Sequence, residues 1–225
     1  MSELFGSSEA FFRTMAAYNA AIWPVQIITY ILGIAAVILV LRETKLSDRI
    51  VSLIMGCLWL WSGIVFCFLY FGKSSPMFYI MGSFLILQGI LFLLYSFRVY
   101  VTRVLSFRAR GGSYTIVGTV MIAYAWVIYP LIGHLTGHAY PQTPVFGVAP
   151  CPVTIFTFGL LLLTHKRVPG VILVIPLLFS LGGIMAVLTY GVYADVGLVA
   201  SGIIGTIMII NRNIEISELA KSSKR

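Results

Sequence analysis

Three residues in the C-terminal half of the chain, His134, His138 and Cys151, have side chains able to bind a soft metal or carry redox chemistry. Copper and zinc accept imidazole and thiolate ligands. The four-residue spacing places both histidines on one face of a helix, if the preceding helix extends that far. Gly133 and Gly137 weaken that helix, and no fourth ligand is apparent. The alternative is that Cys151 is a small residue packed in a tight turn.

Cys151 also begins an unusual segment of backbone, because Pro150 and Pro152 flank it and a long apolar run follows. Proline removes a backbone donor and favours extended geometry in the preceding residue, yet Pro152 suits the first turn of a helix. From Pro152 to Thr164 a helix is about 20 Å long, against about 30 Å for a bilayer core. Either residues 144–151 enter the membrane as irregular chain, buried by protein or lining a cavity, or the helix continues through the basic residues 165–167. The prolines and Gly147 favour irregular chain.

The composition is that of a membrane protein. The chain of 225 residues is 60% hydrophobic and 10% charged, with a mean hydropathy of +1.00, well away from soluble averages. Its net charge of +8 is carried almost wholly between apolar segments. Anionic lipid headgroups are therefore the expected partner, and nucleic acid is not.

We predict an all-α polytopic membrane protein with seven transmembrane helices in one domain, residues 1–225. The predicted spans are residues 23–41, 50–71, 77–97, 114–133, 150–164, 169–192 and 196–211. Thirteen of the 15 lysines and arginines then fall on one side. The positive-inside rule makes that side cytoplasmic, with the N-terminus outside and the chain in the cytoplasmic (inner) membrane.

The residues before the first span indicate a short amphipathic helix on the outer surface. Phe11, Phe12, Met15 and Ile22 recur at helical spacing, and Ser7 or Ser8 can cap the helix. The alternative is an outward extension of the first span.

An internal repeat is a second prediction. Residues 23–30 (WPVQIITY) align with residues 151–158 (CPVTIFTF), sharing proline, valine, isoleucine and threonine. The repeat units would be residues 19–97 and 150–211, parallel to each other and joined by a linker helix at 114–133. Sugar carriers of the SWEET type use this three-plus-one-plus-three plan, an analogy of fold alone. Chance resemblance between apolar segments is the alternative.

Neutral polar side chains are the candidates for a ligand-binding pocket near the helix breaks at Pro24, Pro150 and Pro152. The proposed set is Trp23, Gln26, Thr29, Gln88, Cys151, Thr154 and Thr157. Ordinary interhelical hydrogen bonding is the alternative role. No acidic or basic residue falls clearly within a span, and Asp195 is nearest, at the outer turn before the last one. This argues against proton relays, and a hydrolase would lack an acid–base partner.

The stretch from Tyr18-Asn19 to Trp23-Pro24 and the segment Phe146–Pro152 resemble an uncharacterised prokaryotic family of multi-pass membrane proteins, a domain of unknown function. The resemblance covers nearly the whole chain. It implies a prokaryotic cytoplasmic membrane and brings no activity, cofactor or substrate.

Three functions follow as hypotheses. The first is a small transporter or solute-binding membrane protein, not an enzyme, with an outward-facing cavity for a neutral or amphiphilic small molecule. The second is a metal- or redox-responsive protein using Cys151, His134 and His138. The third is a structural subunit or homo-oligomer that packs through the small residues Gly197, Ser201 and Gly205. None requires a cofactor.

Overall fold

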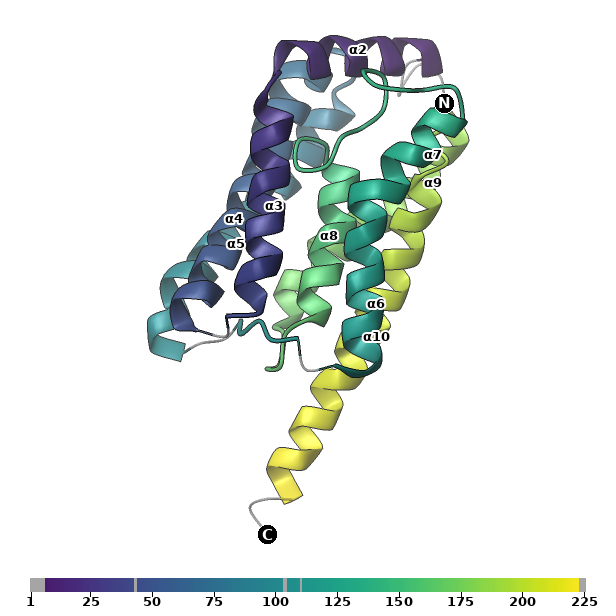
Figure 1. Cartoon of the computed structure of the whole chain (residues 1–225). Helices are drawn as coiled ribbons and strands as arrows, with labels where there is room; N and C mark the ends of the chain where they lie inside the picture. The colour runs from purple at the N-terminus through teal and green to yellow at the C-terminus, as the bar shows by residue number, and fades with distance from the viewer. Residues whose placement is uncertain (1–6, 43, 103–104, 110, 223–225) are drawn as a thin grey trace.

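The computed structural model describes residues 7–42, 44–102, 105–109 and 111–222, and they form an all-helical bundle (Figure 1). A helix or continuous helical run overlaps each predicted span, and several of these helices are shorter than predicted. The bounds are α2 Ser8–Ala21, α3 Val25–Val40, α4 Lys45–Trp61 with η1 Ser62–Tyr70 and η2 Phe71–Lys73, α5 Met77–Thr102, α6 Gly112–Ala123 with η3 Tyr124–Ile128 and α7 Tyr129–Leu135, α8 Pro150–Leu162, α9 Gly170–Tyr190, and α10 Asp195–Ser222.

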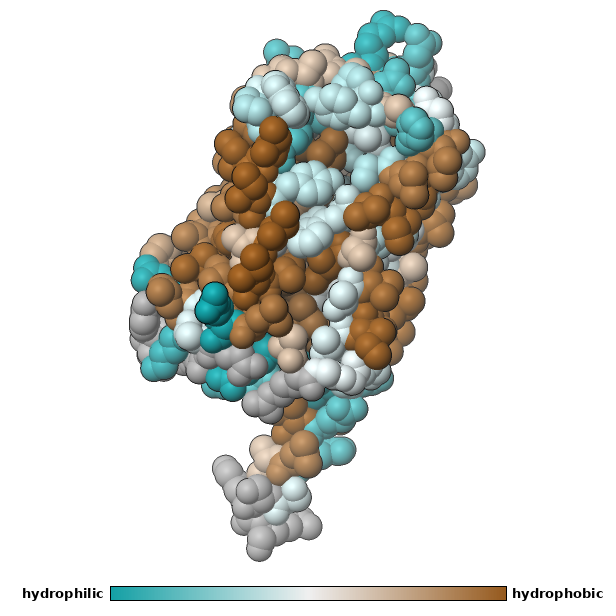
Figure 2. Space-filling view, viewed as in Figure 1, coloured by the Kyte–Doolittle hydropathy of each residue, from teal (hydrophilic) through white to brown (hydrophobic). Residues whose placement is uncertain are grey.

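Within the described residues, five helical runs are long and apolar enough to cross a membrane. The pair α2–α3, bent by 82°, is a sixth if it counts as one span, and α8 is a shorter apolar helix. Figure 2 shows hydrophobic residues across the middle of the bundle and hydrophilic residues gathered towards its two ends. This distribution suits a membrane protein, whose outer surface must match the hydrocarbon of the bilayer.

The short helix α8 forms the core of the bundle. Twelve of its 13 residues are buried, and Cys151 is partly exposed. It packs most closely against α6 and α10, and the Trp59 indole of α4 donates to Thr157 Oγ1 at 2.9 Å. A helix that is apolar on every side is stabilised by burial of all its faces, which a central position provides.

The C-terminal end of α8 is closed by a buried arginine of α10. The Arg212 guanidinium donates to the carbonyls of Leu161 and Leu162, at 3.0 and 2.8 Å, and to Thr164 Oγ1 at 2.6 Å. These carbonyls lack partners within the helix, and a cation opposes the negative end of the helix dipole. The sequence pattern placed this charge outside the spans, whereas the structure buries it in the bundle.

Asp48, at the start of α4, is a second buried charge at this end. Its carboxylate accepts from Ser106 Oγ and from the Phe107 backbone N–H, at 3.0 and 2.8 Å. The connector that carries these residues forms an isolated antiparallel bridge between Phe107 and Thr164. Hydrogen-bonded side chains and paired backbone therefore close the bundle here.

Irregular chain leads into α8 at the opposite end, as the proline pattern predicted. Residues 143–149 are non-helical and buried, and helices α2 and α3 satisfy their carbonyls. The Tyr18 hydroxyl donates to Val148 O at 2.7 Å, and the Thr29 hydroxyl to Phe146 O at 3.0 Å. Gly147 has φ +82° and leaves no room for a Cβ beside Thr29. Protein thus buries this segment, as backbone without helical partners requires.

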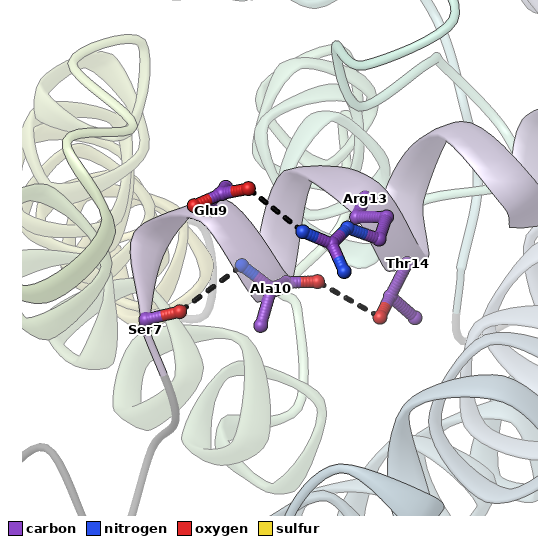
Figure 3. Close-up of polar contacts among 5 residues, drawn as sticks. All are labelled: Ser7, Glu9, Ala10, Arg13 and Thr14. Atoms are coloured by element: carbon purple, nitrogen blue, oxygen red, sulfur yellow. Dashed lines mark hydrogen bonds and ion pairs between the residues drawn. The ribbon is translucent and has the colours of Figure 1, made fainter.

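Helix α2 is a separate amphipathic helix and not an extension of α3. Ser7 Oγ caps it by accepting from the Ala10 N–H at 3.2 Å, and Glu9 pairs with Arg13 at 2.7 Å on its exposed face (Figure 3). Phe12 and Met15 are buried on the opposite face. In Figure 1, α2 lies across one end of the bundle, above the start of α8.

The two helices matched by the predicted repeat lie in different surroundings. Helix α3 packs against α4 and exposes a row of isoleucines, among them Ile27, Ile31 and Ile38. Helix α8 is enclosed and packs against α6 and α10. The internal repeat therefore gains no support from the packing.

Candidate functional site: an apolar cavity with a polar end

A cavity of about 330 Å³ lies beneath α2, between α5, α9 and the N-terminal ends of α8 and α10. Its volume is at the lower end of the range of small-molecule sites, about 300–1,000 Å³. Most of its lining is aromatic or aliphatic: Phe11, Met15, Phe66, Met77, Phe78, Ile80, Met81, Phe84, Leu85, Ile175, Leu178, Phe179, Met185, Tyr190 and Leu198. Such a lining favours the apolar part of a ligand.

The cavity opens sideways between α5 and α9. Several of its lining residues are exposed on the outside of the bundle, including Ile80 (57% exposed) and Phe84 of α5 and Leu178 (61% exposed) of α9. Gly182 of α9 also borders the opening, and a Cβ built there meets nothing within 4 Å. Since these outer faces are apolar, the opening suits exchange with a lipid environment more than with water.

A polar cluster of three side chains from different helices lies at the inner end of the cavity. The Asp195 carboxyl is 1% exposed. Its Oδ1 accepts from the Tyr129 hydroxyl at 2.6 Å, and its Oδ2 accepts from Cys151 Sγ at 3.4 Å, a longer contact typical of sulfur. All three residues border the cavity. The site therefore combines apolar walls with one hydrogen-bonded acidic group.

A π-helical segment brings two tyrosines to this cluster. In an α-helix, residues five apart point about 140° away from each other. In η3 the Tyr129 N–H bonds the Tyr124 carbonyl five residues earlier, and the two rings meet edge to face with centroids 6.4 Å apart. The Tyr124 hydroxyl donates to Ala194 O at 2.9 Å, next to the residue that Tyr129 contacts. Such π-segments occur often at functional sites.

The turn between α9 and α10 sets the position of Asp195. Gly191 ends α9 in the left-handed conformation, with φ +74°, which a glycine adopts without steric cost. Asp195 then begins α10 and points its carboxyl towards the first turn of α8. The positive ends of two helix dipoles therefore meet at one carboxyl group.

Of the proposed ligand-binding residues, Cys151 borders the cavity, together with the helix-break residue Pro150. The other polar side chains bond to the protein itself. Trp23 is 58% exposed on the outside of the bundle beside Pro24. The hydrogen bonds of the others run from Gln26 to Asn19 O, from Thr29 to Phe146 O, from Gln88 to Ile172 O, from Thr154 to Pro150 O and from Thr157 to Val153 O. These contacts match the alternative role, hydrogen bonding within and between helices.

The structure keeps apart the three residues proposed as metal ligands. His134 is exposed in the last turn of α7, and the His138 ring stacks on Phe12 with centroids 3.5 Å apart. Cys151 bonds instead to Asp195. Within the described part of the chain, no group of three or more histidine, cysteine, aspartate or glutamate residues has the geometry of a metal site.

Residues 8–219 match the family described as "Family of unknown function (DUF6064)". The chain belongs to this family. The match confirms the resemblance noted in the sequence and runs from the first residue of α2 into α10, so it includes every wall of the cavity. No curated protein and no solved structure matches the chain.

Tyr129 and Asp195 are the site residues of this DUF6064 chain that sequence reasoning missed. Tyr129 carries no signal in the local sequence that marks it as a site residue, and the structure buries it completely. The sequence pattern places Asp195 at the outer turn before the last predicted span, where its role in the site is not evident. An acidic residue bordered by apolar sequence on both sides was the available signal.

Proposed function

We propose that this protein is a membrane protein that binds a small amphiphilic molecule in the cavity beneath α2, as a transporter or a solute-binding protein. In the proposed arrangement the seven helical runs cross the membrane, with the N-terminus outside. The side rich in lysine and arginine is cytoplasmic. The cavity then lies in the outer half of the membrane.

The observation that carries this proposal is the lateral opening between α5 and α9. An opening bordered by exposed apolar residues gives access from the bilayer, where an amphiphile partitions. The opposite end of the bundle is closed around Arg212 and Asp48. For a transporter, this arrangement corresponds to a state closed to the cytoplasm.

The test is to obstruct the opening. Gly182→Phe places a ring at the mouth, at a position where a Cβ meets no neighbouring atom. Gly170→Phe is the matched control, because Gly170 lies on the same helix, is equally open around its Cβ and is absent from the cavity lining. Both proteins are compared with the wild type in phosphatidylcholine nanodiscs.

Three probes share a ten-carbon chain: decanol, decyltrimethylammonium and decyl sulfate. We expect at least one of them to raise the thermal unfolding temperature of the wild type and of Gly170→Phe in a saturable manner. The shift should be lost in Gly182→Phe. Absence of any saturable shift in the wild type, or an unchanged shift in Gly182→Phe, would reject the proposal.

A further inference from the structure

Asp195 is an acidic group without a basic partner at the cavity. Among the described residues that line the cavity there is no lysine, arginine or histidine. Tyr129 and Cys151 each give Asp195 one hydrogen bond, but neither carries a positive charge. A buried carboxylate is costly unless a cation balances it. A ligand cation placed against Asp195 would balance the ionised form of this carboxyl.

The aromatic walls of the cavity also favour a positively charged group. Phe11, Phe66, Phe78, Phe179 and Tyr190 all line the cavity. The faces of aromatic rings are electronegative and attract ammonium groups, most strongly where water is excluded. Methionines at the same walls, such as Met81 and Met185, adapt their shape to an irregular apolar ligand.

We propose that the cavity selects cationic amphiphiles, with the ammonium group of the ligand against Asp195 and its apolar chain extending between α5 and α9. This inference rests on the proposed function, and it names the ligand's charge. It also narrows the expectation of a neutral or amphiphilic ligand to an amphiphile with a positive charge. A ligand with an anionic headgroup is repelled by the carboxylate, and this repulsion adds to the specificity.

The experiment compares the three decyl probes by charge. Decyltrimethylammonium, decanol and decyl sulfate differ only in the headgroup, and the quaternary ammonium stays charged at every pH. Apparent Kd values come from the concentration dependence of the unfolding temperature in neutral phosphatidylcholine nanodiscs. We expect the wild type to bind the cation about tenfold more tightly than decanol, which corresponds to about 1.4 kcal/mol, and to bind decyl sulfate least.

Asp195→Asn is the decisive variant, because it keeps an oxygen to accept from Tyr129 while removing the charge. It should bind decyltrimethylammonium and decanol with similar affinity. Glu218→Gln is the matched control, an exposed acidic residue on the same helix, and it should keep the wild-type preference. If Asp195→Asn fails to fold, protection of the wild-type Cys151 thiol from N-ethylmaleimide gives a second measurement. The cation should protect Cys151 at a lower concentration than decanol does.

Two outcomes would overturn the inference and leave the proposed function standing. One is equal binding of the cation and decanol by the wild type, with binding still blocked by Gly182→Phe. The other is an unchanged preference for the cation in Asp195→Asn. If no probe binds, the proposed function fails as well.

Discussion

The two ends of α8 are both contacted by charged residues of α10, yet these charges are used differently. Asp195 and Arg212 lie 17 residues apart on α10, and each reaches the end of α8 whose dipole its charge complements. Arg212 directs its guanidinium to two backbone carbonyls and a threonine hydroxyl. The Asp195 carboxyl accepts from two side chains, those of Tyr129 and Cys151, and it borders a cavity.

The charge of Arg212 stabilises the end of a helix, whereas the charge of Asp195 is available to a ligand in the cavity. At the C-terminal end of α8, the Arg212 guanidinium donates its hydrogen bonds to backbone carbonyls, which have no partner within the helix at such an end. At the N-terminal end, the backbone presents donors, and the carboxyl is held by a phenol and a thiol. We therefore expect substitutions at the first end to reduce stability most, and those at the second to alter binding.

The largest loss of stability is expected for Arg212→Met. The change removes three hydrogen bonds, including the one that Leu162 O accepts from the guanidinium, for a loss of about 3 kcal/mol in the free energy of unfolding. Unfolding by sodium dodecyl sulfate in mixed micelles measures it. Arg167→Met, at an exposed arginine of the adjacent connector, is the control and should change the free energy by less than about 0.5 kcal/mol. Equal effects of both substitutions would show that Arg212 does not close the helix end.

A smaller loss is expected for Tyr129→Phe at the other end. Without its hydroxyl, Asp195 Oδ1 has no donor, and we expect a loss of about 1–2 kcal/mol. A double-mutant cycle with Asp195→Ala, which removes the acceptor, should give a coupling energy of about 1 kcal/mol, because the two side chains share one hydrogen bond. Additive effects would contradict the contact. Tyr79→Phe, at an exposed tyrosine of α5, is the control.

The smallest effect on stability is expected for Cys151→Ala, below about 1 kcal/mol, because a thiol is a weak donor. The rate at which a thiol reagent reaches Cys151 should be more informative about the cavity. In a Cys57→Ala background, N-ethylmaleimide should label Cys151 through the cavity, while Cys67 stays unlabelled because it is buried. Gly182→Phe should slow the labelling several-fold. Labelling at the wild-type rate in that variant would show that the thiol is reached by another route.

The local features of the fold were predictable from the sequence because they depend on neighbouring residues. The serine before a run of helical spacing identified α2 and its cap, and the prolines around Cys151 identified an irregular start to α8. Apolar length identified the long helices within a few residues. Each of these signals acts within one segment, so no tertiary contact was needed.

The site was predicted only in part because it is assembled from distant segments. Asp195 and Tyr129 are 66 residues apart in the sequence. The π-helical turn that directs Tyr129 towards Asp195 could not be predicted from the local sequence. Neutral polar residues such as Thr154 and Thr157 resemble pocket residues, but a helix carbonyl four residues earlier accepts from each of them. Sequence alone does not reveal which polar group is satisfied locally.

The double attachment of α8 to α10 has a mechanical consequence. Sliding either helix along the other would break the contacts of Asp195 and Arg212 at the same time, so both contacts oppose that movement. We therefore expect any opening or closing of the cavity to come from displacement of α2, α5 or α9 around this pair.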